Sequence, residues 1–136
     1  MTEHLPGGKF TKTVHETLSE RTKPENNRRS PFAVVVTGAG KGLGRAISLC
    51  YARAAASHIC ISSRTKSDLD SLSAEIRAIS PDTTILSHPC DTSDPSAVQS
   101  LAQAVAAWPR LDVVIANAGV ISKYIEDSVN PKTRQV

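Results

Sequence analysis

The 136-residue sequence has few aromatic side chains and no long apolar run. Phe, Trp and Tyr make up only 4% of the residues, so a packed core must be built from Ala, Val, Ile and Leu. No apolar run approaches the roughly 18–20 residues that a membrane-spanning helix needs, which argues against a membrane protein. Sixteen Lys and Arg against 13 Asp and Glu leave a net charge of only +3, which gives no reason to expect a nucleic-acid partner. The length suits a single globular domain.

Cysteine and histidine are also sparse, and their spacing lacks any metal-binding pattern. The three cysteines form no C-x-x-C pair and the four histidines stand apart from one another, so we predict no metal site. We expect Cys50, Cys60 and Cys90 to be small buried residues in a reducing compartment. Residues 1–30 contain no apolar segment of a secretory signal and carry four glutamates, which favours a cytoplasmic protein.

The composition divides the chain at Pro31. Residues 1–30 are polar and show no sustained periodicity, so they are predicted to be a flexible N-terminal extension. Residues 31–122 alternate between apolar runs and helical patterns, and we interpret them as the folded unit. Residues 123–136 are polar again and are predicted to form an irregular tail.

The folded unit is predicted to alternate strands with helices. The expected strands are residues 32–37, 58–62, 83–87 and 111–116. The expected helices cover residues 43–55 and 67–79, and a third begins at Pro95 with Asp94 as its N-cap. This alternation is typical of an α/β fold with a parallel sheet and right-handed crossovers. We expect strand order 3-2-1-4, with the first two helices on one face and the third on the other.

Two details of the helices are also predicted. Ser67 with Asp70 is similar to a capping box at the start of the second helix. The first helix is expected to bury one apolar stripe. Its members are Leu43, Ala46, Ile47, Cys50, Tyr51 and Ala54.

A glycine-rich segment, residues 37–44, stands between the first strand and the first helix. Its sequence is Thr-Gly-Ala-Gly-Lys-Gly-Leu-Gly. Glycines let main-chain N–H groups approach a pyrophosphate, and the start of the helix offers unpaired N–H groups to the same anion. In this strand–glycine–helix context the segment predicts a dinucleotide site in a partial Rossmann (doubly wound) fold of about four strands, with helices on both faces.

The end of the second strand indicates which dinucleotide is bound. An NAD site commonly has an acidic residue there for the ribose hydroxyls, whereas this strand ends in Ser62, Ser63 and Arg64. Arg64 is able to pair with a 2′-phosphate, both serines can donate hydrogen bonds to it, and Lys41 adds a second cation. This favours NADP as cofactor. The alternative is that Arg64 and Lys41 are merely solvated surface charges.

Over about residues 32–122, these motifs together resemble the short-chain dehydrogenase/reductase family. Residues 37–44 match its TGxxxGxG motif, residues 117–119 match its Asn-Ala-Gly motif, and Asp91 matches the position that binds the adenine amino group. The resemblance implies a pyrophosphate and ribose site at the glycine segment, and a contact of Asn117 with the central ribose and the sheet end. The resulting cofactor-binding set is Gly38, Lys41, Gly42, Leu43, Gly44, Ser62, Ser63, Arg64, Asp91, Asn117 and Gly119.

The match to the family stops before its catalytic motif. Family members use a Ser and a Tyr-x-x-x-Lys pair, but Tyr124 is followed four residues later by Ser128. We therefore assign no catalytic residue, and we expect a chain shortened before that motif.

Two functions remain open from the sequence. The first is an NADP-dependent oxidoreductase that moves hydride between NADPH and a carbonyl or alcohol substrate, in fungal secondary metabolism to judge from its likeness to fungal members. The alternative is a catalytically inactive NADP-binding fragment, or a partner of a full-length relative. The apolar fourth strand also predicts association with a like or unlike chain through its free edge.

Overall fold

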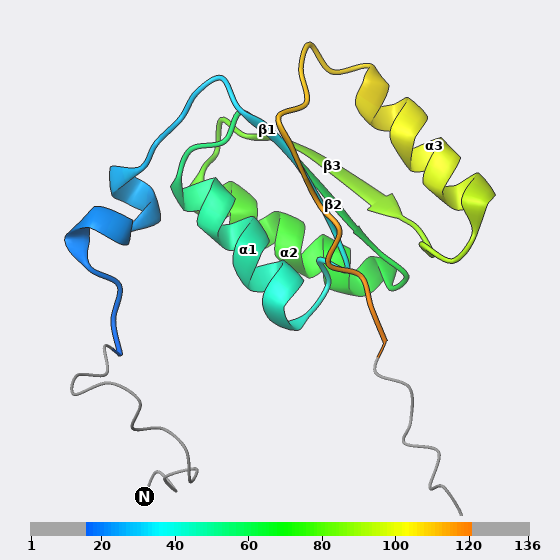
Figure 1. The fold of residues 1–136 in the computed structure, drawn as a ribbon, viewed down its shortest axis with the longest axis horizontal. Coiled ribbons are helices and arrows are strands. Elements are labelled where there is room, and N and C mark those ends of the chain that lie inside the picture. The colour runs from blue at the N-terminus through cyan, green and yellow to red at the C-terminus, as the bar shows by residue number, and fades with distance from the viewer. Residues whose placement is uncertain (1–15, 121–136) are drawn as a thin grey trace, which may run out of the picture.

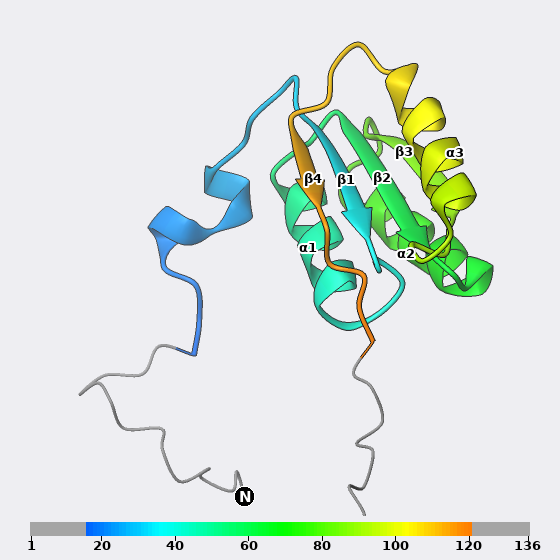
Figure 2. The same ribbon diagram turned by 45° about the vertical axis from the view of Figure 1, so that its right-hand side comes forward.

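The computed structural model describes residues 16–120, and within them the four predicted strands form one parallel sheet. The strands are β1 (Ala33–Thr37), β2 (His58–Ser63), β3 (Thr84–Pro89) and β4 (Val113–Ile115). Their spatial order is β3-β2-β1-β4, which confirms the predicted order (Figure 2). All four strands therefore end at the same edge of the sheet.

Three helices cover the two faces of this sheet as predicted. They are α1 (Gly42–Arg53), α2 (Lys66–Ile79) and α3 (Pro95–Ala106). Helices α1 and α2 lie side by side on one face and α3 lies on the other (Figure 1). The connections from β1 to β2 and from β2 to β3 run in the same direction, whereas the connection carrying α3 crosses back over β1, so right-handed crossovers require this division.

The core has two parts because side chains of a strand alternate between faces. Val34 and Val36 of β1 point toward α1 and α2, whereas Val35 points toward α3. The main buried partners on the first face are Ile59, Ile61, Leu69, Leu72 and Ile76. On the second face they are Cys60, Cys90, Leu101 and Val105. The inner strand β1 is thus apolar from Ala33 to Val36, because both of its sides are covered.

The buried face of α1 differs from the predicted stripe. Two members of the predicted stripe, Ile47 and Tyr51, are partly buried against the core, whereas Leu43 is 69% exposed and Cys50 is exposed. The fully buried residues of this helix are Gly44, Ser48 and Ala52. Small side chains let the helix lie close to the sheet, and the Ser48 hydroxyl donates to the Gly44 carbonyl over 2.8 Å, so its burial leaves no unpaired group. A search for apolar periodicity does not register such a stripe.

The caps of the other two helices test the capping predictions. Helix α2 begins at Lys66, one residue before the predicted start, and its N-cap Thr65 makes no side-chain hydrogen bond to the helix. The capping box at Ser67 is therefore wrong, and Asp70 instead pairs with Lys66 over 2.7 Å. At α3 the prediction is confirmed, since Asp94 accepts a hydrogen bond of 2.9 Å from the Ser96 N–H.

Residues 16–30 contain two single-turn helices that the sequence did not predict. They are η1 (Glu20–Thr22) and η2 (Pro24–Asn26). Side-chain amides close these turns: Asn26 donates to the Glu20 carbonyl over 2.8 Å, and Asn27 to the Lys23 carbonyl over 2.8 Å. One turn is too short to leave a hydrophobic period. The predictions for residues 1–15 and 121–136, including Tyr124, lie outside the described residues.

Strand β4 is shorter than the predicted residues 111–116 and is only partly covered. Its central residue Val114 is 57% exposed on the face that carries α3, because that helix lies over β2 and β3 rather than over β4. Within residues 16–120, β1 is its only neighbouring strand. Association through this free edge stays a prediction.

Candidate functional site

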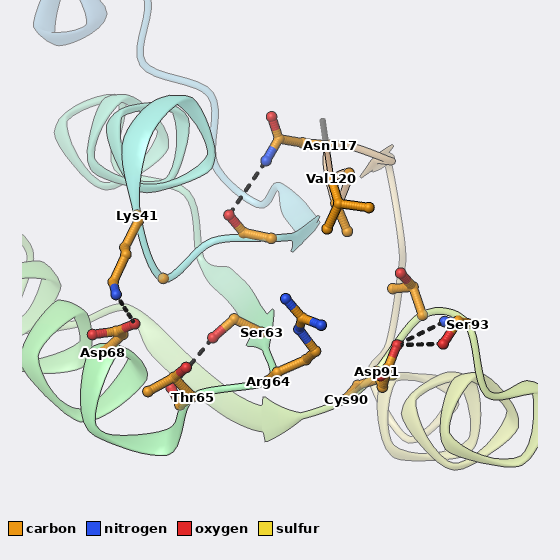
Figure 3. A pocket seen from close by; sticks show the side chains of 15 residues that line it. Lys41, Ser63, Arg64, Thr65, Asp68, Cys90, Asp91, Ser93, Asn117 and Val120 are labelled. Carbon is orange, nitrogen blue, oxygen red and sulfur yellow. Dashed lines mark hydrogen bonds and ion pairs between the residues drawn. The ribbon is translucent and has the colours of Figure 1, made fainter. Parts of the chain in front are cut away.

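A cleft of about 530 Å³ lies at the carboxyl ends of the strands, where a doubly wound sheet places its ligands. It is bounded by the four segments that follow β1, β2, β3 and β4 (Figure 3). The lining residues are Gly38, Gly40, Lys41, Ser63, Arg64, Thr65, Asp68, Cys90, Asp91, Thr92, Ser93, Asn117, Ala118, Gly119 and Val120.

The glycine segment follows β1 and packs closely on its surroundings. Gly38 has a φ of +64°, a conformation that side chains other than glycine rarely adopt. A Cβ atom on Gly44 would lie 2.3 Å from the Gly38 carbonyl oxygen and 2.6 Å from Nδ2 of Asn117. Gly44 therefore allows α1 to begin directly against the turn.

Asn117 holds this turn against the end of β4. Its Nδ2 group donates to the carbonyl oxygens of Thr37 and Gly38 over 3.1 and 3.3 Å. The Thr37 hydroxyl in turn accepts from the N–H groups of Asn117 and Ala118, both at 3.1 Å. These bonds fix the glycine segment relative to residues 117–119, so the geometry gives Asn117 a positioning role.

The cleft carries two cations and two carboxylates. Lys41 is 80% exposed, and its Nζ lies 3.4 Å from an Asp68 carboxylate oxygen. Arg64 points into the cleft from the end of β2, whereas Lys41 turns away from the centre toward Asp68 (Figure 3). The charges of these lining residues therefore balance.

Asp91 is held in its ionised form at the end of β3. Its carboxylate accepts from the N–H and the hydroxyl of Ser93 over 3.0 and 2.7 Å. The pKa of Asp91 is lowered first by the main-chain hydrogen bond from Ser93, then by the side-chain hydrogen bond from Ser93 and by the positive charge of Arg64. An ionised carboxylate there can accept a hydrogen bond from an amino group.

Seven of the eleven predicted cofactor residues line the cleft. They are Gly38, Lys41, Ser63, Arg64, Asp91, Asn117 and Gly119. Gly42, Leu43 and Gly44 belong to the first turn of α1 and lie outside the lining.

Ser62 also lies outside the lining and corrects one detail of the prediction. Its side chain is 1% exposed and its hydroxyl has no hydrogen-bond partner. Because side chains alternate along β2, the Ser62 side chain is buried on the opposite face of the strand from Ser63, which lines the cleft. As placed, it cannot donate a hydrogen bond to a phosphate in the cleft.

Asp68 is the most important lining residue that the sequence analysis missed. An acidic residue of an NAD site is expected at the end of β2, but this one comes from the first turn of α2. A Cβ on Gly40 would meet the Asp68 Cβ at 3.0 Å, so the glycine segment packs against the start of this helix. Counting one helical turn past the strand end could have found it.

Two further features are absent from the described part of the chain. Within residues 16–120, no three His, Cys, Asp or Glu side chains gather in a way that could hold a metal ion. No helix in that range is both long enough and apolar enough to cross a membrane.

Comparison with known proteins identifies relatives. The model of the short chain dehydrogenase family matches residues 33–135. The short chain dehydrogenase pigC of Monascus ruber is 36% identical over 121 residues, which are 84% of this chain and 39% of that relative. The chain thus spans well under half the length of this relative.

Solved structures show the same likeness. A metagenomic short-chain oxidoreductase in complex with NADP is 34% identical, with a TM-score of 0.59 over 65% of this chain and 39% of that one. A short-chain dehydrogenase from Sphingobium yanoikuyae in complex with NADPH is 26% identical, with a TM-score of 0.59 over 65% of this chain and 34% of that one. Sequence family and fold agree, and this chain belongs to the short-chain dehydrogenase family.

Proposed function

We propose that this chain is the NADP-binding part of an oxidoreductase that moves hydride between NADPH and a carbonyl or alcohol carbon. The observation that carries the proposal is the meeting of the glycine segment with Arg64 in one cleft at the carboxyl ends of β1 and β2. The two solved relatives that hold NADP or NADPH support the choice of cofactor.

The residues of the cleft suit the parts of such a cofactor. At α1 the N-cap Lys41 makes no side-chain hydrogen bond to the helix, so N–H groups of the first turn stay free for a pyrophosphate. In our proposal Gly38, Gly42, Leu43 and Gly44 shape this main-chain cradle. Close approach at Gly44 keeps the helix start against the turn.

The remaining contacts come from the other three strand ends. Arg64 and Lys41 offer cations to the 2′-phosphate, with Ser63 beside them, and this set omits the buried Ser62. Asp91 accepts from the adenine amino group. Residues 117–119 lie at the ribose next to the nicotinamide.

The reaction itself is a proposal about the complete enzyme. NADPH supplies the hydride when it is bound. The 136 residues contain no Tyr-x-x-x-Lys, so we assign them binding and orientation and no acid or base. The proposal also includes a role in fungal secondary metabolism and a cytoplasmic location.

Calorimetric titration of the 136-residue chain with NADPH and NADH tests the proposal. We expect NADPH to bind more tightly by about 1–3 kcal/mol, as charge-assisted hydrogen bonds to a phosphate provide. Arg64→Ala should remove most of that preference, whereas Arg77→Ala, a change on an exposed arginine of α2 outside the cleft, should not. Equal affinity for both cofactors, or an unchanged preference in Arg64→Ala, would overturn it.

A further inference from the structure

The carboxylate of Asp68 pairs with one of the two cations that line the cleft. Its oxygen lies 3.4 Å from the Lys41 ammonium, and it is 24% exposed, whereas Lys41 is 80% exposed. Both residues line the cleft together with Arg64. Lys41 therefore faces a competing anion before any phosphate arrives.

The Arg45 side chain holds the main chain of Asp68 in place. Arg45 donates to the carbonyls of Gly40 and Asp68 over 3.3 and 3.4 Å, and its other nitrogen pairs with Glu75 over 2.6 Å. This arginine joins the glycine segment to the first turn of α2. The main chain that carries the Asp68 carboxylate thus has a fixed place beside the glycine segment.

A carboxylate at this position acts on the two cofactor forms in opposite directions. A 2′-phosphate brought to Lys41 and Arg64 must displace the Asp68–Lys41 pair and then lie near a like charge. A 2′-hydroxyl instead gains an acceptor, since a carboxylate accepts hydrogen bonds from ribose. Both effects reduce the difference between the affinity for NADPH and the affinity for NADH.

We propose that Asp68 is a specificity-determining residue that limits the preference of the cleft for NADPH over NADH. The inference rests on the proposed function, because it concerns the same cofactor. Lys41 and Arg64 favour the phosphate, and Asp68 opposes them. The free chain keeps Lys41 paired with Asp68 until a phosphate takes its place.

Asp68→Asn tests this by removing the charge while keeping the side-chain size. The ratio of the NADH dissociation constant to the NADPH dissociation constant should rise about two- to fivefold, the range expected for a partly exposed ion pair. Asp70→Asn is the matched control: it removes the same charge from the same helix, also from a lysine pair, but outside the cleft lining. That control should leave the ratio unchanged.

Two smaller probes keep the test independent of the nicotinamide half. Adenosine 2′,5′-bisphosphate and 5′-AMP differ only in the 2′-phosphate, so the same change in ratio should appear with them. In a Lys41→Met background, the rise in this ratio caused by Asp68→Asn should differ from the rise seen in the unchanged chain, because the Asp68–Lys41 pair is already broken. The effect should also shrink in 1 M salt, where charges on exposed groups are screened.

The outcomes separate the two hypotheses. If the unchanged chain prefers NADPH and Asp68→Asn gives the same ratio as Asp70→Asn, or a lower ratio, the role of Asp68 is overturned and the proposed function stands. If the folded chain binds neither cofactor, the proposed function is overturned and the role of Asp68 falls with it. Circular dichroism and a thermal melt of each variant verify that folding is retained.

Discussion

The side-chain amide of Asn117 donates a hydrogen bond of 3.1 Å to the main-chain carbonyl of Thr37, across 80 positions of sequence. The bond joins the ends of β4 and β1 at the point where the glycine segment begins. The Thr37 hydroxyl completes the junction by donating to the Ile115 carbonyl over 3.3 Å. One wall of the cleft is thus fixed by a polar junction rather than by apolar packing.

Thr37→Val should break this junction while keeping the shape of the side chain. The N–H groups of Asn117 and Ala118 would lose their acceptor, and a partner left unpaired costs about 1–3 kcal/mol. Urea unfolding should show that loss, and calorimetry should show weaker NADPH binding. Thr37→Ser keeps the hydroxyl and should stay close to the unchanged chain. Equal stability of the valine and serine variants would contradict the role given to the hydroxyl.

Gly44→Ala tests the close approach of α1. Helix propensity alone predicts a gain of about 1 kcal/mol from this change. The new Cβ would lie 2.3 Å from the Gly38 carbonyl oxygen, so we expect overpacking to dominate and to cost about 1–3 kcal/mol net.

Gly119→Ala is the control for that substitution. The nearest atom to its new Cβ is 3.9 Å away, so stability should change little. Denaturant unfolding of both variants decides the matter. A Gly44→Ala protein more stable than the unchanged chain would show that helix propensity, not contact, governs this position.

Sequence patterns predicted the sheet order and the helix faces because they depend on strand–helix alternation and on the handedness of crossovers. At α1 they were only partly right: Ile47 and Tyr51 of the predicted stripe pack against the core, but the fully buried residues, Gly44, Ser48 and Ala52, are small. They also overestimated the length and the burial of β4. An apolar run predicts a strand that can be buried on both faces, but it does not show whether a helix lies over Val114.

The site was predictable where a motif fixes the backbone. It was less predictable where packing decides the direction of a side chain. Arg64 and Asp91 follow strands directly, and both line the cleft. Ser62 belongs to the same strand end but is 1% exposed, on the opposite face of β2 from Ser63, so the register of β2 decides which of the two serines lines the cleft. Asp68 comes from the next helix, so only the packing of Gly40 on α2 brings it to the cleft.

Asp112 should make the stability of the fold depend on acid. Its carboxylate accepts from Arg110 and, over 2.8 Å, from the Ala33 N–H, and these bonds in that order hold its pKa below the ordinary 3.8. A lowered folded-state pKa means that the stabilisation is fully present above pH 3.8 and is lost as the pH falls below that value.

Asp112→Asn is therefore expected to lower the free energy of unfolding at pH 7 and to flatten its decline below pH 4. Urea unfolding at a series of pH values measures both effects. Asp82→Asn, at an exposed turn residue, is the matched control and should keep the slope of the unchanged chain. An Asp112→Asn protein with an unaltered slope would show that other carboxylates carry the acid response.

The three cysteines should differ sharply in reactivity, because burial separates Cys60 from Cys50. Burial first, and then the neighbouring Cys90, raise the pKa of the Cys60 thiol to about 12, so it carries almost no thiolate at pH 8. Cys50 is exposed on α1, and Cys90 is 5% exposed at the cleft.

With a disulfide reagent at pH 8, we expect Cys50 to react fast, Cys90 slowly, and Cys60 only on unfolding. Cys50→Ser should abolish the fast phase, and NADPH should slow the modification of Cys90. Peptide mapping that finds Cys60 modified as fast as Cys50 in a chain with an intact circular dichroism spectrum would refute this placement of the sheet core.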